Sequence, residues 1–173
     1  MKKTGAGQVV SAGLIFDQVD TVTDLVSRFV LGALVVLVIG EALLRSFVNL
    51  SLGFAEEVTG YLVVALTLFG AARALRSGSL FEVCFISDRL RGRSRRLLQS
   101  FYVLLSLSVC IVLAIKSADL VASSLARGKF AATVLHTPLW IPQLLLPVGF
   151  AVIGFFLLEK LLLLFQQPRT EAH

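Results

Sequence analysis

The sequence predicts an all-α membrane protein with four transmembrane helices, an amphipathic helix before them and an interfacial segment between the second and third. Of the 173 residues, 57% are hydrophobic and only 16% are charged, whereas about a quarter of the residues in a soluble domain are charged. The uncharged stretches are also long, and about 20 mostly apolar residues are enough for a helix to cross a bilayer. The composition therefore excludes an ordinary soluble domain.

The first half of the chain predicts an amphipathic lead-in helix followed by a helical hairpin. In residues 14–24, apolar side chains recur at helical spacing with acidic side chains between them, which is typical of a helix that lies on or enters a membrane surface. We expect the first span at residues 25–47 and the second at residues 56–75, joined by a short loop. A loop this short makes the two spans antiparallel neighbours.

The second half of the chain predicts an interfacial segment and two further spans. Residues 76–96 form the long connection, and within it residues 79–90 are too short and too charged to cross a membrane, so we expect an interfacial helix there. The third span is expected at residues 97–126 and the fourth at residues 140–165, where Pro147 should kink the helix. We interpret residues 1–173 as a single four-helix membrane domain.

The basic residues are distributed unequally between the two sides of this predicted membrane domain. If the N-terminus is inside, twelve of the 16 Lys and Arg residues lie on the inner side, and such an excess marks the cytoplasmic side of a membrane protein. We therefore expect both termini in the cytoplasm. Because most of the bases lie between apolar segments, they indicate topology and lipid contact rather than binding of nucleic acid. The four bases on the outer side are Arg45, Lys116, Arg127 and Lys129.

Charged groups near membrane depth are candidates for functional contacts. Glu56 and Glu57 open the second span, where carboxylates suit the positive end of the helix dipole, and the hairpin brings Arg45 beside them. We predict that these three residues form a boundary cluster that orients the first two spans. Glu41 lies four residues before Arg45 on the same helical face, so it forms an ion pair or contacts another subunit. Alternatively, Glu41 is the coupling residue of a self-contained small proton-coupled exporter.

No pattern in the sequence predicts a catalytic, cofactor-binding or metal-binding site. Cys84 and Cys110 are far apart, and neither lies in a CxxC motif or beside a histidine. Neither a Ser/His/Asp grouping nor a glycine-rich phosphate loop can be recognised. We therefore expect no enzyme activity, no cofactor and no metal.

Short segments distributed over most of the chain carry a resemblance to a known family. In their order and spacing, they resemble the small membrane subunit (Q subunit) of tripartite ATP-independent periplasmic (TRAP) transporters. At Leu80 the family usually has a histidine. The segments are Leu43-Leu44-Arg45-Ser46-Phe47, Phe54-Ala55-Glu56-Glu57, Leu68-Phe69-Gly70-Ala71-Ala72, Leu75-Arg76-Ser77-Gly78, Thr137-Pro138-Leu139-Trp140-Ile141-Pro142 and Leu146-Pro147-Val148-Gly149-Phe150.

The resemblance implies a set of partners in a bacterial inner membrane. A large membrane subunit would carry the substrate and sodium sites, and a periplasmic binding protein would deliver an organic anion. The small subunit would be a fixed, non-catalytic stator that packs against the large one and contacts lipid. On this hypothesis, Arg127 and Lys129 are candidates for contact with the binding protein, and Arg45, Glu56 and Glu57 for contact with a partner subunit.

Overall fold

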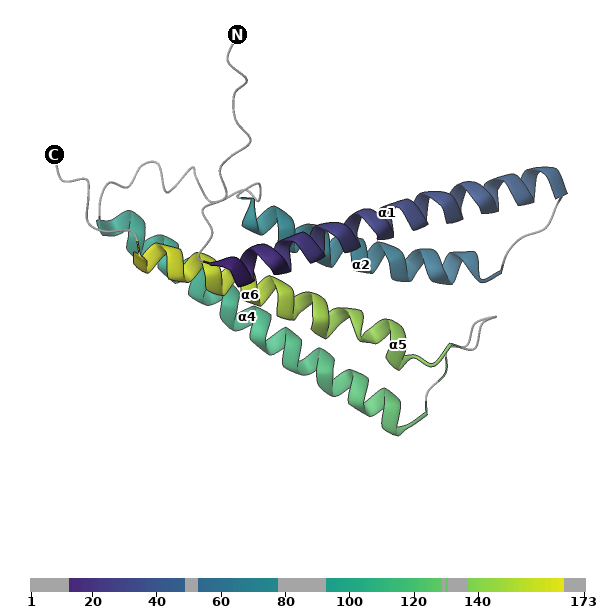
Figure 1. Ribbon diagram of the computed structural model, residues 1–173. Helices are drawn as coiled ribbons and strands as arrows, with labels where there is room; N and C mark the ends of the chain where they lie inside the picture. The colour runs from purple at the N-terminus through teal and green to yellow at the C-terminus, as the bar shows by residue number, and fades with distance from the viewer. Residues whose placement is uncertain (1–12, 49–52, 78–92, 129, 131–136, 167–173) are drawn as a thin grey trace, which may run out of the picture.

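A computed structural model gives the architecture of the protein (Figure 1). The predicted interfacial segment lies mostly within residues 78–92, which the structure does not describe, so it remains a prediction. Leu80 also lies in this range. The structure describes residues 13–48, 53–77, 93–128, 130 and 137–166.

The described residues form helices, and four helical segments are long and apolar enough to cross a membrane. This confirms the predicted all-α fold with four transmembrane helices. The only β feature among the described residues is an isolated bridge between Phe130 and Pro138. The helices are α1 (Leu14–Val48), α2 (Ala55–Arg76), α4 (Arg93–Ala126), α5 (Trp140–Gln143) and α6 (Leu145–Gln166).

The lead-in residues and the first span form one unbroken helix, α1, of 35 residues. No glycine or proline separates the two parts, so nothing in the backbone ends the helix between them. Thr21 and Thr23 each donate a side-chain hydrogen bond to the carbonyl four residues earlier, which is how hydroxyl side chains are satisfied inside a helix. The acidic lead-in therefore continues directly into the membrane span.

The last predicted span is interrupted near its start. It consists of the short helix α5 and the longer helix α6, which are separated at Leu144. Pro147 explains the break, because it has no N–H to donate and its ring displaces the carbonyl of Gln143, four residues earlier. The kink predicted from Pro147 is therefore a change of helix rather than a smooth bend.

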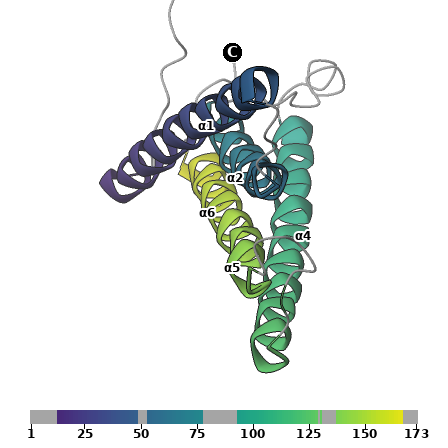
Figure 2. The same cartoon turned by 90° about the vertical axis from the view of Figure 1, so that its right-hand side faces the viewer.

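The helices are arranged as an open row in the order α1, α2, α6, α4 (Figures 1 and 2). Helix α1 packs along α2, α2 along α6, and α6 along α4, so that α1 and α4 lie at opposite ends of the row. In the most apolar part of each span, between 11% and 22% of the residues are buried. Most of the apolar surface is therefore left for lipid or for another protein.

Helices α4 and α6 are held together by a seam of small side chains. On α4, the buried residues Val103, Cys110, Ser117 and Ser124 recur every seven positions, the repeat of helices that wind around each other. Val103 and Cys110 form an apolar cluster with Leu157 of α6. Small residues at such a seam let two membrane helices approach closely.

Helices α2 and α6 make an even closer contact at Gly149. A Cβ atom at this position would lie 2.7 Å from the Cβ of Leu68, far inside normal van der Waals contact. Only glycine fits here without a shift of one helix. The contact joins two of the segments that carry the resemblance described above, and it fixes the height at which α2 and α6 meet.

Candidate functional site

Arg76, the last residue of α2, is the centre of an ion-pair network. Its Nε and Nη2 atoms lie 3.0 and 3.2 Å from the two carboxylate oxygens of Glu159 on α6. The side chains are almost fully buried, with 5% of Arg76 and 3% of Glu159 exposed. The guanidinium also lies 5.5 Å from the ring centre of Phe156. This two-point contact on an aromatic face suits arginine and would not suit lysine.

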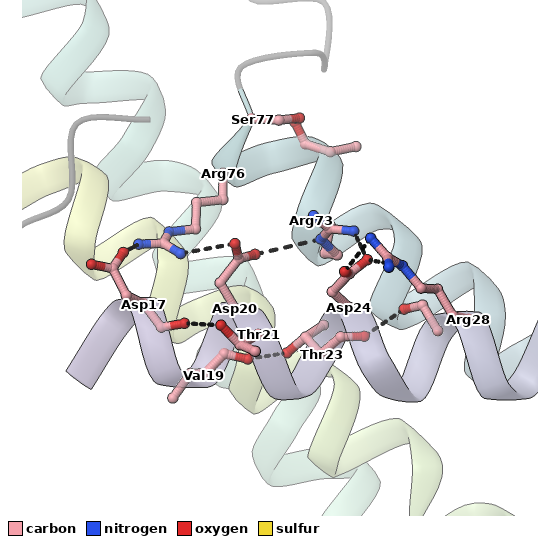
Figure 3. Close-up of polar contacts among 12 residues, drawn as sticks. Asp17, Val19, Asp20, Thr21, Thr23, Asp24, Arg28, Arg73, Arg76 and Ser77 are labelled. Atoms are coloured by element: carbon pink, nitrogen blue, oxygen red, sulfur yellow. Dashed lines mark hydrogen bonds and ion pairs between the residues drawn. The ribbon is translucent and has the colours of Figure 1, made fainter. Parts of the chain in front are cut away.

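The acidic side of α1 completes the network (Figure 3). Arg76 Nη2 lies 2.5 Å from Asp17 Oδ1, and Arg76 Nη1 lies 3.0 Å from Asp20 Oδ2. Arg73 pairs with Asp24 and lies 3.5 Å from Asp20. The carboxylates of α1 and α6 thus compensate the buried Arg76, as a buried charge requires, and those of α1 also pair with the more exposed Arg73.

The spacing of these residues explains why they meet. The three aspartates are three and four residues apart, so they share one helical face, and the two arginines are three apart on α2. At the same end of the molecule, the ring of Phe16 on α1 stacks on Phe155 of α6 with 4.5 Å between the ring centres. The polar side of the lead-in therefore faces α2 and α6.

A second polar contact lies at the opposite end of α2. Glu57 Oε1 accepts hydrogen bonds from Tyr61 Oη at 2.5 Å and from Thr137 Oγ1 at 2.8 Å. Thr137 lies 80 residues further along the chain, immediately before α5. One of the predicted site residues, Glu57, thus joins the start of α2 to the start of the last span.

The other members of the predicted boundary cluster are not brought to Glu57. Arg45 and Glu56 are exposed, and neither forms an ion pair with any residue that the structure describes. Glu41 is half-buried and, within the same described ranges, does not pair with Arg45 four residues later. Instead of a cluster of three residues, the structure contains a hydrogen bond between Glu57 and Thr137.

The outer bases have different positions. Arg127 is exposed, and its Nε donates a hydrogen bond to the carbonyl of Ser123 at 3.2 Å. Gly128 follows with a φ of 55°, the left-handed conformation that ends many helices and favours glycine. Lys129 lies outside the described residues. Arg127 does not take part in either of the two polar contacts of α2.

Three contacts at different heights show that α2 and the last span run parallel and in register. The first and last of these pairs are 80 and 83 residues apart in the sequence. A helix rises about 1.5 Å per residue, so the two ends of α2 are roughly 28 Å apart, close to the thickness of a bilayer core of about 30 Å. The polar contacts therefore form two layers whose separation matches the thickness of a bilayer core. The three pairs are Glu57 with Thr137, Leu68 with Gly149, and Arg76 with Glu159.

Comparison with known families identifies the chain. Residues 34–167 match the family described as tripartite ATP-independent periplasmic transporters, DctQ component. The chain belongs to this family. It is therefore a TRAP transporter small (Q) membrane subunit with several transmembrane helices, as its sequence segments had suggested. A comparison with curated proteins found no match.

The matched region of this TRAP subunit contains one side of the ion-pair network but not the other. Arg73, Arg76 and Glu159 lie within it, whereas the aspartates of α1 precede residue 34. Glu57 and Thr137 are both inside the match. The Glu57 layer thus lies wholly within the matched region, whereas the Arg76 layer also includes aspartates of the lead-in, which precedes that region.

The described part of this TRAP subunit offers little for binding a hydrophilic solute. A groove of about 260 Å³ between α4 and α6 is open and lined by apolar side chains, among them Leu107, Ile111, Phe150 and Leu158. Within the described residues, no three His, Cys, Asp or Glu side chains are placed to hold a metal ion. The polar groups of the Arg76 network and of the Glu57 contact are used between helical segments.

Sequence reasoning identified Glu57 but missed its partner and the whole ion-pair network. The sequence predicts the acids of residues 14–24 at a membrane surface, and it places Arg73 and Arg76 only among the bases of the inner side. A usable signal was present, because three acids on one helical face can match two arginines with the same spacing on a neighbouring helix. Nothing in the sequence indicated that Thr137 lies beside Glu57.

Proposed function

We propose that this chain is the stationary, non-catalytic subunit of a sodium-coupled transporter that imports an organic anion delivered by a periplasmic binding protein. One observation carries the proposal: α2 is fixed to the last span at both polar layers, by Glu57 with Thr137 and by Arg76 with Glu159. A helix pair with charge-assisted contacts at both ends is suited to hold its shape while a partner moves.

The open row supports the same function. A row of four helices has two wide faces, and large apolar side chains are exposed along α1 and α4. Such surfaces need lipid or a membrane partner. Packed beside a large permease subunit, the row would widen the footprint of the complex in the bilayer and resist the motion of the transporting part.

We further propose that the chain lies in the bacterial inner membrane with both termini in the cytoplasm. The excess of bases on one side supports this orientation. The Arg76 layer is then cytoplasmic and the Glu57 layer periplasmic. Arg45, Glu56 and Glu57 remain candidates for contact with the large subunit, and Arg127 and Lys129 for contact with the binding protein.

Reconstitution into proteoliposomes tests this function. The chain alone should transport nothing, whereas the chain together with the large subunit and the binding protein should take up the organic anion when a sodium gradient is imposed. Proton-driven transport by the lone chain, lost in Glu41→Gln, would instead favour the small exporter. Uptake by the large subunit and binding protein that is unchanged when this chain is omitted would contradict the proposal.

A further inference from the structure

Helix α4 has a second seven-residue pattern, on a different face from the seam that packs on α6. Five of its side chains follow one another at alternating steps of four and three residues, the spacing by which one helix meets another along a seam. All five are exposed, by 51% to 76%, so α6 does not cover them. The residues are Leu105, Val109, Val112, Lys116 and Asp119.

The lysine of this pattern lies between the two polar layers. Helix α4 runs antiparallel to α6 (Figure 1), and Cys110 Sγ lies 3.3 Å from the carbonyl oxygen of Phe150, nine residues before Glu159. Lys116, six residues beyond Cys110, is therefore roughly 22 Å from the level of Glu159, and the layers are roughly 28 Å apart. A charge at this depth is unfavourable against lipid. Its contact within the chain is loose, with 4.0 Å between Lys116 Nζ and Asp119 Oδ2.

A second copy of the chain carries the complementary charges at the matching depth. Two copies inserted in the same orientation have parallel α4 helices, with every residue at the same depth in both. About a two-fold axis along the membrane normal, the same surface serves both copies. The base of each copy then meets the acid of the other, so the contact is neutral and complementary in charge.

We propose that two copies of this chain pair along this seam of α4, with Lys116 of each copy bound to Asp119 of the other. The apolar members of the seam, Leu105, Val109 and Val112, pack across it. The charged residues fix the register, as a single polar position does in paired helices. The inference does not depend on the proposed function, because it concerns a contact between two identical chains.

Disulfide crosslinking in membranes tests whether the seam pairs. Val112→Cys places a thiol on the seam, and the matched control, Ile111→Cys, places one about 100° around the helix, with 55% of Val112 and 50% of Ile111 exposed. The large subunit is co-expressed, so that the contact must form in the assembled complex, and the wild type with its own cysteines gives the background. With an oxidant, we expect Val112→Cys to form a linked dimer and Ile111→Cys to form at most about a tenth as much.

Mixing two charge variants separates a contact between copies from the pair within one chain. In the Val112→Cys background, Lys116→Asp gives every copy two acids on the seam, and Asp119→Lys gives every copy two bases. Either variant expressed alone should crosslink at least about tenfold less, because like charges then meet across the seam. Expressed together with different tags, the acidic and basic copies should crosslink to each other as well as Val112→Cys alone does. A pair confined to one chain is broken in both variants, and mixing cannot restore it.

Several outcomes would overturn the inference. Equal crosslinking of Ile111→Cys and Val112→Cys would indicate random collision, and crosslinking of Val112→Cys no higher than the wild-type background would mean that lipid or the large subunit covers the seam. Crosslinking unchanged by Lys116→Asp and Asp119→Lys, or lost in both and not recovered by mixing, would show that the charges do not pair between copies. Size-exclusion profiles identify charge variants that do not fold; for those, the comparison of Val112→Cys with Ile111→Cys, which leaves both charges in place, decides.

Discussion

At the residue scale, the side chain of Arg76 links three helices through ion pairs. It is the last residue of α2, and it faces carboxylates from α1 and α6 while almost fully buried. Such a network adds little net stability compared with apolar packing, but removing Arg76 leaves the carboxylate of Glu159 buried without its partner. The loss of stability caused by a substitution therefore depends more on the buried charge left without a partner than on the ion pair removed.

Replacing Arg76 should be far more costly than replacing an exposed arginine of the same network. Arg76→Leu should lower the free energy of unfolding by about 3 kcal/mol or more, and Arg76→Lys by less, because lysine keeps the charge but loses the two-point contact. Thermal unfolding of the purified chain in detergent measures both. The control is Arg28→Leu, because the Arg28 side chain is 75% exposed and such pairs contribute at most about 1 kcal/mol. Equal losses in Arg76→Leu and Arg28→Leu would refute this account of the network.

The hydrogen bond between Thr137 and Glu57 is a second residue-scale test. Thr137→Val keeps the shape but removes the donor, so it should lower the free energy of unfolding by about 1–2 kcal/mol. A double-mutant cycle with Glu57→Leu measures the coupling, since in that background Thr137→Val should cost clearly less. Additive losses in the cycle would mean that the two side chains do not interact in the folded protein.

At the scale of the helices, the approach of α2 to α6 depends on the absence of a side chain at Gly149. Gly149→Ala should force the helices apart and cost about 1–3 kcal/mol, and Leu68→Ala in the same chain should recover part of the loss. Gly154→Ala on the same helix is the matched control, because no atom lies within 4 Å of the Cβ that it would add. Thermal unfolding of these three variants measures the losses. Similar stability of Gly149→Ala and Gly154→Ala would rule out a close approach at Gly149.

The helices are also the scale at which the sequence was most informative. Long uncharged stretches predict four spans, and the described residues contain four helices long and apolar enough to cross a bilayer, because apolar length decides whether a helix can do so. Helical spacing showed that residues 14–24 have a polar side, but it could not show that this side meets Arg73 and Arg76. Periodicity identifies a face of one helix and says nothing about its neighbour.

The candidate site was predicted less well for the same reason. The expected cluster of Arg45, Glu56 and Glu57 assumed that charges near one end of a hairpin pair with one another. In the structure Glu57 accepts a hydrogen bond from Thr137 instead. That contact depends on α2 running parallel and in register with a span that begins some 80 residues later, and no local pattern specifies such a register.

At the scale of the whole molecule, the open row explains why this chain belongs in a complex. Helices α1 and α4 lie at the two ends of the row, where α1 packs mainly on α2 and α4 mainly on α6 (Figure 1). Large apolar side chains are exposed along both helices. The polar contacts lie between helices of the row, at two layers about a bilayer core apart. Contacts within the row hold these helices together, and in the proposed complex a membrane partner would cover part of the outer apolar surface.

The most direct test of a stationary support is a distance measured across the row during transport. Spin labels at Leu43 on α1 and Leu125 on α4, both exposed, report the separation of its two ends in the assembled transporter, with a second pair placed on the large subunit. As substrate and sodium are added, we predict that the distance between Leu43 and Leu125 stays constant while the large-subunit pair moves. A change across the row as large as the change in the large subunit would contradict the claim that this chain is the fixed part.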